Sequence, residues 1–359
     1  MYNIHLLPAL FGDSILIEYG KKSKPSYILI DGGPFYGYAK LMKGLKKVAP
    51  NLKELELLVI THIDIDHIDG VVKLLNQKKP PFTINEIWFN GYDEIKDLKS
   101  DMLGVSQGEF SSLLIKEKGL KQNETYFKGK AVMVSNYNKL PVFSLKGGME
   151  ITLLSPGKEG LVKLKNLWES ESETNHDFEV IKSKLDSDSR YKIKPDDLLG
   201  DLVEDNAGDD ATPDKSVPNL SSIAFIGKYD NKTCLFAGDA TSEYLLKAIN
   251  PILKKSGKSK LKVDAWKLAH HGSKKSNQPA LMDKMDTKNM LVSSNGDRYK
   301  HPDKECIAKL LEKNKGLKFY FNYYSKQNKV WDDAALQKKY GYKAIYPADG
   351  EEGISVKLA

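Results

Sequence analysis

The sequence predicts an α/β protein, and three patterns carry that prediction. Short apolar runs with the composition of buried strands recur along the chain, as at 55–60 and 233–237. Stretches with helical spacing of apolar residues alternate with them, as at 37–49. A cluster of ionisable residues, 61–70, fills the turn between one such strand and the helix that follows it. Turns of this kind are where α/β proteins place their functional sites.

Four side chains of this turn have the spacing of a metal site. Alternation along an extended segment sends His62, Asp64 and Asp66 to one side, and His67 follows at the start of the helix. Imidazole and carboxylate together suit borderline divalent metals, so the group fits one or two ions. The alternative is a solvated acidic turn with two surface histidines. Two of only 7 histidines lie here, interleaved with Asp, and this favours the metal site.

Composition sets broad limits. A chain of 359 residues with 40% hydrophobic content can bury a sizeable core, and we expect one domain over 1–359. The net charge of +7, from 55 basic and 48 acidic residues, mildly favours a polyanionic substrate, although lysine-rich surfaces are common. Two cysteines are too few for a disulfide framework, and a reducing cytoplasm fits best. We expect neither a signal peptide nor a membrane span, since a basic leader and a long apolar run are absent.

The first part of the chain is predicted to be a meander entering a sheet. Strand patterns at 2–7, 15–19 and 27–30 are separated by Gly12-Asp13-Ser14 and by a lysine-rich turn, and the third ends in Asp31-Gly32-Gly33. The glycines let backbone pass close to the site, and the Asp side chains can bind loop N–H groups. Asp13 either contacts the substrate or braces its loop.

Further elements of this part are a basic amphipathic helix at 37–49 and a strand at 84–89. Residues 92–140 then read as helical and polar, either as a cap beside the site or as packing helices. Strand patterns return at 141–145 and 149–154.

Residues 158–217 are predicted to be a mobile surface insertion or a partner-binding loop. Acidic and small polar groups crowd this stretch, and large apolar residues are few. His176 lies within it, and a lone histidine in such a stretch is most often exposed.

The last part of the chain carries three more motifs at predicted strand ends. A hairpin at 223–237 ends in Gly238-Asp239-Ala240, where a carboxylate can bridge two cations. A strand at 263–269 leads into His270-His271-Gly272-Ser273, so that one imidazole can bind metal while the other faces the substrate. A strand at 290–294 precedes a loop with Arg298, Lys300 and His301, and a helix follows at 303–313. The tail, 317–359, is predicted to be two or three strands that close a second sheet.

These motifs, in this order, resemble the metallo-β-lactamase superfamily. His62-x-Asp64-x-Asp66-His67 resembles the first metal motif of the ComEC/Rec2-like branch, and His270-His271-Gly272-Ser273 is similar to the most recognisable signature of that branch. The resemblance covers nearly the whole chain outside 92–140 and 158–217. It implies an αββα sandwich of two mixed sheets with helices outside, formed from an N-terminal and a C-terminal half that meet at the metals.

The resemblance also implies roles for individual residues. Two divalent cations, Zn²⁺ or Mn²⁺, would be held by the following ligands: His62, Asp64, Asp66, His67, Asp239 and His271. Asp239 would bridge the cations, and catalytic roles fall to Asp66, His270 and His301. An exchange of roles between His270 and His271 stays open. Substrate binding is expected of four further residues: Asn219, Ser273, Arg298 and Lys300.

One departure from the wider superfamily concerns the first metal. Asp64 stands where many members have His. A further His usually completes the first metal site, and Asn219 stands in its place, as Asn does in the ComEC-like branch. Between the first motif and Asp239, His176 is the only histidine of the sequence. The site is therefore rich in oxygen donors, which favours Mn²⁺ over Zn²⁺.

The leading functional hypothesis is a metal-dependent phosphodiesterase, a nuclease on DNA, in which activated water attacks the substrate. Motifs for a serine nucleophile elbow, a phosphate-binding loop or a Rossmann fingerprint are absent from the sequence. Hydrolysis of a small phosphoester or a lactone is the first alternative. The second is an effector or scaffold subunit of a bacterial defence complex, gated by a protein partner that docks on 158–217.

Overall fold

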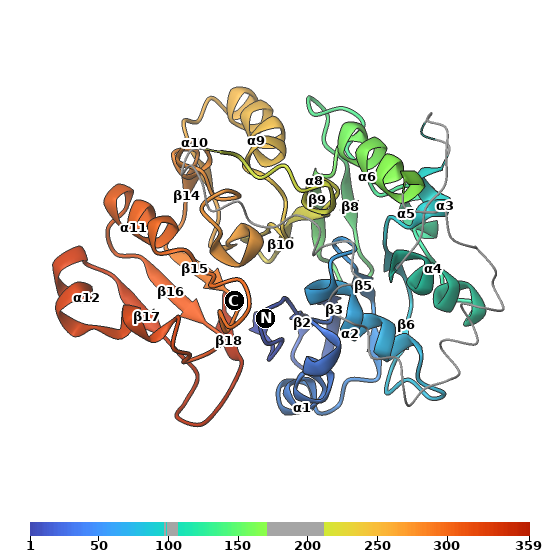
Figure 1. The fold of residues 1–359 in the computed structure, drawn as a ribbon, viewed down its shortest axis with the longest axis horizontal. Helices are drawn as coiled ribbons and strands as arrows, with labels where there is room; N and C mark the ends of the chain where they lie inside the picture. The colour runs from blue at the N-terminus through green and yellow to red at the C-terminus, as the bar shows by residue number, and fades with distance from the viewer. Residues whose placement is uncertain (97, 99–106, 171–211) are drawn as a thin grey trace.

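The computed structural model describes residues 1–96, 98, 107–170 and 212–359. Two β-sheets pack face to face, and helices cover their outer faces (Figure 1). This is the predicted αββα sandwich. The predictions for His176 and for most of the acidic stretch lie outside the described residues.

The first sheet has six strands in the order β18-β1-β2-β3-β5-β7. β1, β2, β3 and β18 pair antiparallel, whereas β3, β5 and β7 run parallel, so the sheet is mixed. Its strands have these bounds: β1 Tyr2–Leu6, β2 Ile15–Lys21, β3 Lys24–Ile30, β5 Leu57–Val59, β7 Ile87–Trp88 and β18 Ile354–Lys357.

The second sheet has eight strands in the order β17-β16-β15-β13-β11-β10-β9-β8. It is parallel from β17 to β11 and antiparallel from β11 to β8. Its strands have these bounds: β8 Val142–Ser144, β9 Glu150–Ser155, β10 Ala224–Tyr229, β11 Lys232–Phe236, β13 Ala265–Lys267, β15 Asn289–Val292, β16 Lys318–Phe321 and β17 Lys343–Ile345. Two small parallel pairs lie outside the large sheets: β4 Glu54–Leu55 with β6 Thr83–Ile84, and β12 Leu261–Lys262 with β14 Met285–Asp286.

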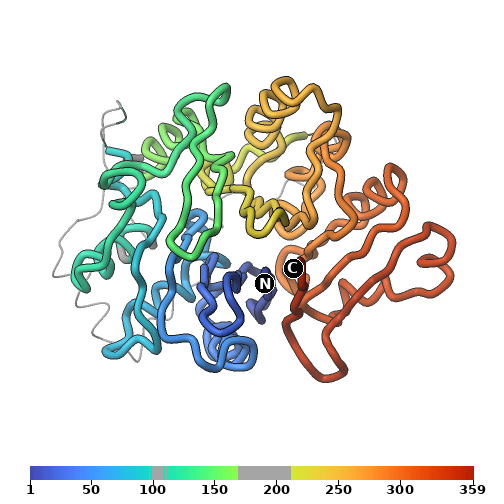
Figure 2. Tube along the Cα trace, turned by 180° about the vertical axis from the view of Figure 1, so that it is seen from behind, coloured from blue at the N-terminus to red at the C-terminus, as the bar shows by residue number. Residues whose placement is uncertain are grey.

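Helices form the two outer layers. Four long helices contribute buried side chains to the cluster on the outside of the first sheet: α1 Tyr38–Val48, α2 Ile65–Leu75, α4 Gln107–Glu117 and α6 Lys158–Ser170. Ile95 of the short helix α3 (Tyr92–Ile95) joins them. Three do the same for the second sheet: α9 Ser242–Ser256, α10 Pro279–Met282 and α11 Lys304–Lys313. Shorter helices complete the described fold: α3 Tyr92–Ile95, α5 Glu124–Phe127, α8 Val217–Leu220 and α12 Ala334–Tyr340. The N- and C-termini lie side by side, since β1 pairs with β18 (Figure 2).

Strict alternation explains how each strand serves two layers. In β2, Ile15 and Ile17 belong to the core between the sheets, whereas Leu16 packs in the outer cluster. In β5, Leu57 and Leu58 divide in the same way. Both faces of these strands are buried, which requires the continuous apolar runs seen in the sequence.

The tail differs from its prediction. β16 and β17 extend the second sheet, but β18 crosses to the first sheet and pairs with β1, and α12 interrupts the strands. In return, β8 and β9 of the N-terminal half belong to the second sheet. The two halves therefore exchange edge strands. β18 covers a strand that would otherwise present unpaired backbone groups at the sheet edge.

The start of the 158–217 stretch also differs from its prediction. Residues 158–170 form α6, and Leu161, Leu164 and Trp168 are fully buried in the outer cluster. The low apolar content of the stretch as a whole hides this amphipathic helix, in which these three buried residues recur at helical spacing.

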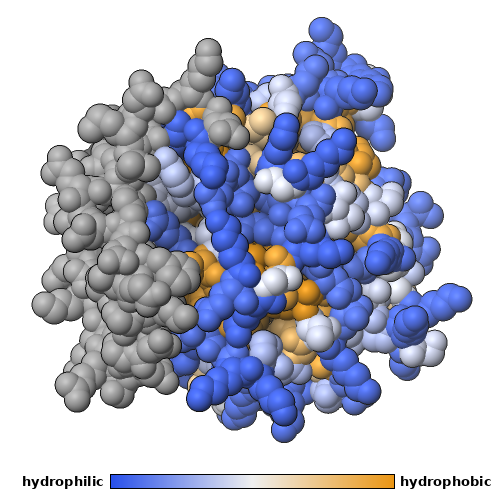
Figure 3. Space-filling model, turned by 90° about the vertical axis from the view of Figure 1, so that its right-hand side faces the viewer, coloured by the Kyte–Doolittle hydropathy of each residue, from blue (hydrophilic) through white to orange (hydrophobic). Residues whose placement is uncertain are grey.

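The face that carries β6 and α4 is largely hydrophilic around an apolar patch (Figure 3). A cavity of about 670 Å³ opens there, lined mostly by the apolar residues Leu75, Pro80, Pro81, Phe82, Ile84 and Leu120, with Lys53 and Lys118 beside them. Within the described residues, every helix is too short or too polar to cross a bilayer.

Candidate metal centre

The metal motif occupies the carboxyl end of β5 and the first turn of α2. Asp64 is the N-cap residue of α2, and Asp66 and His67 lie in its first turn. α2 can approach the 31–33 loop closely only because two glycines meet. A Cβ on Gly70 would lie 2.0 Å from the carbonyl oxygen of Gly32, and Gly12 similarly faces the carbonyl oxygen of Asp66.

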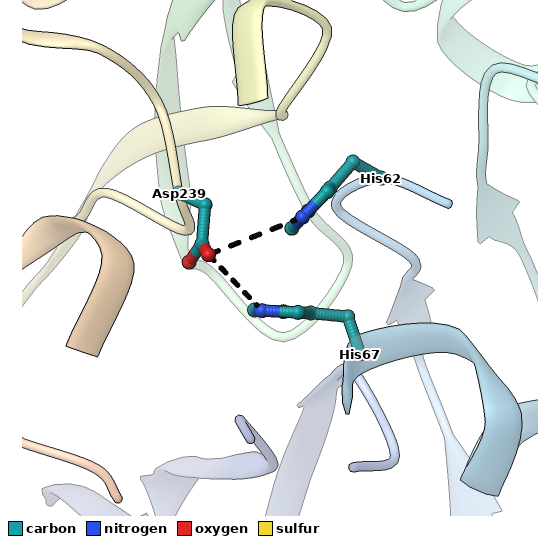
Figure 4. A group of neighbouring side chains, drawn as sticks. All are labelled: His62, His67 and Asp239. Atoms are coloured by element: carbon teal, nitrogen blue, oxygen red, sulfur yellow. Dashed lines mark ion pairs between the residues drawn. The ribbon is translucent and has the colours of Figure 1, made fainter. Parts of the chain in front are cut away.

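Asp239 is the centre of the cluster. It follows β11 in the second sheet, and its Oδ2 atom faces the histidines of the first motif (Figure 4). The distance from this atom to Nε2 is 3.3 Å for His67, 3.7 Å for His271, 3.8 Å for His270 and 4.0 Å for His62. One carboxylate oxygen therefore lies among four imidazole nitrogens contributed by both halves of the chain.

Two groups of side chains in this cluster could each hold a cation. His62, His67 and Asp239 form the first, and Asp66, His67 and His271 form the second. In the second group, Nε2 of His271 lies 3.1 Å from Oδ2 of Asp66. Asp64 lies beside the first group, with its Oδ2 atom 3.3 Å from Nε2 of His62.

The remaining nitrogen of each histidine has a partner of its own. Nδ1 of His67 lies 2.8 Å from Oδ2 of Asp31, and Nδ1 of His271 lies 2.8 Å from the carbonyl oxygen of Ser293. Nδ1 of His62 lies 2.9 Å from Oγ1 of Thr61. With Nδ1 as the hydrogen donor, each ring presents the lone pair of Nε2 to the centre, as metal-binding histidines do.

The donor set fits divalent cations. Nε2 of His62 and of His67, Oδ1 of Asp64 and Oδ1 of Asp239 are buried and have no hydrogen-bond partner among the described residues. Buried polar atoms without partners are costly, and a cation would satisfy them. Ligand atoms that share one tetrahedral Zn²⁺ lie about 3.3 Å apart, which is close to the separations found here.

The backbone at the second histidine pair is strained. His270 and His271 have φ values of 47° and 53°, and Gly272 has φ 91°. Left-handed backbone is uncommon for residues other than glycine and is often found at functional sites. The turn is held by hydrogen bonds from His270 N to Gly238 O and from Ser273 N to His270 O. The turn places the buried ring of His271 beside Asp239 and leaves the partly exposed ring of His270 at the edge of the centre.

Comparison with known proteins agrees with this architecture. Residues 7–106, which include the first metal motif, match the family model described as the metallo-beta-lactamase superfamily. The chain has the metallo-beta-lactamase fold.

Two solved structures are similar to this chain. Zn²⁺-bound PqqB from Methylobacterium extorquens is 12% identical, with a TM-score of 0.43 and 100% coverage of both chains. The short form of human tRNase Z is 8% identical, with a TM-score of 0.41 and the same coverage. No curated protein sequence matches the chain.

Within this metallo-beta-lactamase fold, the carboxylates of the centre favour positive charge. Burial alone would lower the pKa of His271, but Asp239, Asp13 and Asp66 raise that pKa to about 10. Burial alone would raise the pKa of the Asp239 carboxyl, yet the surrounding histidines hold that pKa well below its usual value. The same field would stabilise a divalent cation in place of the protons.

A buried ion pair lies behind His271. Lys267 of β13 is fully buried, and its Nζ lies 2.5 Å from Oδ2 of Asp13 and donates to the carbonyl oxygen of Leu268. Oδ1 of Asp13 lies 3.3 Å from Nδ1 of His271. Asp13 therefore braces the ligand and the opposite half of the chain. These contacts are of the bracing kind, although the partners are side chains rather than loop N–H groups, and the predicted contact with substrate stays a prediction.

The other predicted site residues lie farther from the centre. His301 packs edge-on against His270, with ring centroids 5.0 Å apart, and its Nδ1 lies 3.2 Å from Asp303. Asn219 donates to Asp214 and has its Nδ2 3.2 Å from Nδ1 of His270. Both residues are therefore next to His270 rather than to the ligands of the cluster.

Three predicted substrate residues occupy loops around this edge. Ser273 is buried, and its Oγ accepts a hydrogen bond from Lys275 N. The guanidinium of Arg298 lies over the rings of Phe11 and Tyr299, at 5.4 and 5.3 Å from their centroids. Nζ of Lys300 donates to the carbonyl oxygen of Asp297. Ser273 is joined to His270 through its backbone N–H, whereas these contacts of Arg298 and Lys300 are with residues of surrounding loops.

Sequence reasoning missed three residues that hold the histidines in place. The sequence predicts that Asp31 binds loop N–H groups, and it does accept from Thr61 N at 2.8 Å, but it also orients His67. The sequence pattern places Asp214 in the acidic insertion and Lys267 in a strand, and links neither to the histidines. A lysine within the apolar run before His270-His271 was the available signal for the last of them.

Proposed function

We propose that the protein is a metal-dependent hydrolase of the ComEC/Rec2-like branch that acts as a phosphodiesterase on DNA. The observation that carries the proposal is the position of Asp239 Oδ2 among four buried or half-buried imidazole nitrogens, with Asp66 beside them. The motifs at 62–67 and 270–273 support the assignment to the branch.

When bound, two cations would activate water and neutralise negative charge on the departing oxygen. His62, Asp64, Asp66, His67, Asp239 and His271 would hold them. Asp66 and Asp239, whose carboxylate oxygens lie beside the histidine nitrogens, would orient this water for attack. The buried rings exclude other solvent from this space.

His270 is placed to move a proton at the leaving group. In hydrolysis the water oxygen bonds to phosphorus, the bond from phosphorus to the leaving oxygen breaks, and that oxygen takes up a proton. Nε2 of His270 faces the centre, and its side chain is 25% exposed, whereas that of His271 is fully buried. In its doubly protonated form, His270 can therefore give Nε2–H to the leaving oxygen, keep the hydrogen on Nδ1, and recover a proton at Nε2 from solvent.

The surroundings of the centre favour an anionic substrate. Lys274 and Lys275 follow the histidine turn, and Arg298 and Lys300 lie in the loop before His301. Phosphate diesters are bound by cationic side chains of this kind. The rings of Phe11 and Tyr299 beside Arg298 offer surfaces on which a base can stack.

The test combines metal content with DNA cleavage. Purified protein is analysed by mass spectrometry for bound metal, and nucleotide release is followed from single- and double-stranded DNA with Mn²⁺ or Zn²⁺ added. We expect metal-dependent cleavage that His271→Ala abolishes together with metal binding. His5→Ala is the matched control, because His5 is also a buried histidine but contacts Ser355 and Glu18, remote from the cluster.

Bound metal without cleavage of either form of DNA would overturn the DNA assignment. Chromogenic small phosphodiesters and lactones would then identify the small-ester alternative. Activity that appears only when a cell extract is added would support the partner-gated alternative.

A further inference from the structure

Asp214 makes more contacts at the edge of the metal centre than its position beside an acidic stretch suggests. It lies in 212–216, ahead of α8, and its side chain is 7% exposed. Its Oδ2 atom accepts hydrogen bonds from Oγ of Ser276 at 2.7 Å and from Nδ2 of Asn219 at 2.8 Å. Its Oδ1 atom accepts from the backbone N–H of Ser216. The carboxylate is thus fixed by donors from separate segments.

The same Oδ2 atom lies 3.1 Å from Nδ1 of His270. The opposite ring nitrogen, Nε2, lies 3.8 Å from Oδ2 of Asp239. Nδ2 of Asn219 lies 3.2 Å from the same Nδ1 atom, but the carboxylate of Asp214 is closer and can only accept, so its contact with Nδ1 requires a hydrogen on that nitrogen. His270 therefore carries a hydrogen on Nδ1, and its Nε2 atom faces the centre.

The ring of His270 is less firmly held by the rest of the fold than that of His271. His271 is fully enclosed, and a backbone carbonyl fixes its Nδ1. His270 has a strained backbone and a partly exposed ring whose other described ring contacts are His271 and His301. Without Asp214, the ring could turn over or take the other tautomer.

We propose that Asp214 is a positioning residue that holds His270 in the Nδ1–H form, with Nε2 directed at the site of proton transfer. The effect of Asp214 on catalysis rests on the proposed hydrolase function. The position of the hydrogen on His270 does not depend on that function. It also gives residues 212–216 a direct connection to the centre.

The first measurement does not require activity. In ¹H–¹⁵N spectra of protein labelled with ¹⁵N-histidine, a protected Nδ1–H signal is expected for His270, assigned by its loss in His270→Asn. Asp214→Asn should shift or remove this signal, while the Nδ1–H signal of His271 stays. A wild-type ring with hydrogen on Nε2 alone in the Zn²⁺-loaded protein would overturn the proposal, even if the variant failed to fold.

The second measurement separates positioning from metal binding. Asp214→Asn should keep the wild-type metal content and KM, and should lower kcat about 10²- to 10⁴-fold with a changed pH profile, as expected for a misplaced proton donor. Asp264→Asn is the control, since Asp264 accepts from Thr233 N and Lys232, remote from His270. Loss of metal together with activity, or an unchanged kcat, would contradict the proposal. If DNA is not the substrate, the NMR result still decides the role of Asp214.

Discussion

The two halves of the chain build the candidate metal centre in different ways. The N-terminal half supplies His62, Asp64, Asp66 and His67 from six consecutive positions, and α2 holds them in place. The C-terminal half supplies Asp239 from the end of β11, and His270 and His271 from a strained turn at the end of β13. Local structure is enough to bring the first group together, whereas the second depends on the pairing of β11 with β13.

The carboxylates that anchor the histidines also differ between the two halves, in how deeply they are buried. Asp31, which is fully buried, anchors His67 deep in the first sheet, whereas Asp214 anchors His270 at the exposed edge. We infer that the N-terminal contacts mainly govern metal binding, and that the edge contacts mainly govern turnover. The predictions below test this division, beginning with the largest expected effect.

Asp66→Ala should remove metal and activity together. Asp66 is buried beside His271 and belongs to one candidate cation group, so its loss should lower kcat/KM at least ~10³-fold, about 4 kcal/mol. Metal analysis and DNA cleavage measure this. Asp93→Ala, at a carboxylate paired with Lys96 on the surface, is the control. Activity retained by Asp66→Ala would disprove the two-cation assignment.

Lys267→Met should destabilise the protein by about 3–5 kcal/mol, because it leaves Asp13 charged and buried without its partner. Urea denaturation of the metal-free protein measures the loss. Replacing both members, Lys267→Met with Asp13→Leu, should recover much of it. The exposed pair provides the control: Lys232→Met should cost less than about 1 kcal/mol. Equal losses at the two lysines would show that the buried pair has no special role in joining the halves.

Asp31→Asn should weaken metal binding about 10- to 100-fold, since it removes the carboxylate that orients His67. Competition with a chelator of known affinity measures the change. The comparison of the two halves predicts that Asp214→Asn leaves this affinity at the wild-type value. If both substitutions weaken binding equally, the division between metal binding and turnover is wrong.

The smallest expected effect concerns pH and a carboxyl of the N-terminal half. Burial raises the pKa of Glu94 to about 7. Because this folded-state value exceeds that of the unfolded chain, its contribution to stability is present at low pH and is lost as the pH rises toward about 7. Part of the side chain meets solvent, so water weakens the effect relative to the buried pair above.

Glu94→Gln should therefore gain stability relative to wild type when measured near neutral pH or above, compared with mildly acidic pH. Urea denaturation of both proteins across this range measures the difference. In the C-terminal half, hydrogen bonds from Thr233 and Lys232 outweigh burial and lower the pKa of Asp264, so Asp264→Asn should show no such gain. Parallel pH profiles for wild type and Glu94→Gln would refute the prediction.

What the sequence predicts, and what it does not, follow the same division. The α/β class and the first metal motif could be predicted because periodicity and spacing within a few residues determine them. The pairing of β18 with the edge of the first sheet could not be predicted, since its partner β1 lies at the other end of the chain. α6 was missed because the composition of a long acidic stretch masked one amphipathic helix.

By itself, the sequence determined which residue types are available for a cation and that two sheets would carry them, because alternation along a strand is a local property. Only the tertiary structure decided which oxygen holds each ring: Asp31 for His67, Ser293 for His271 and Asp214 for His270. These partners lie 36, 22 and 56 positions away from their histidines. Such contacts depend on strand pairing and on where connecting segments return, and short-range patterns carry no information about either.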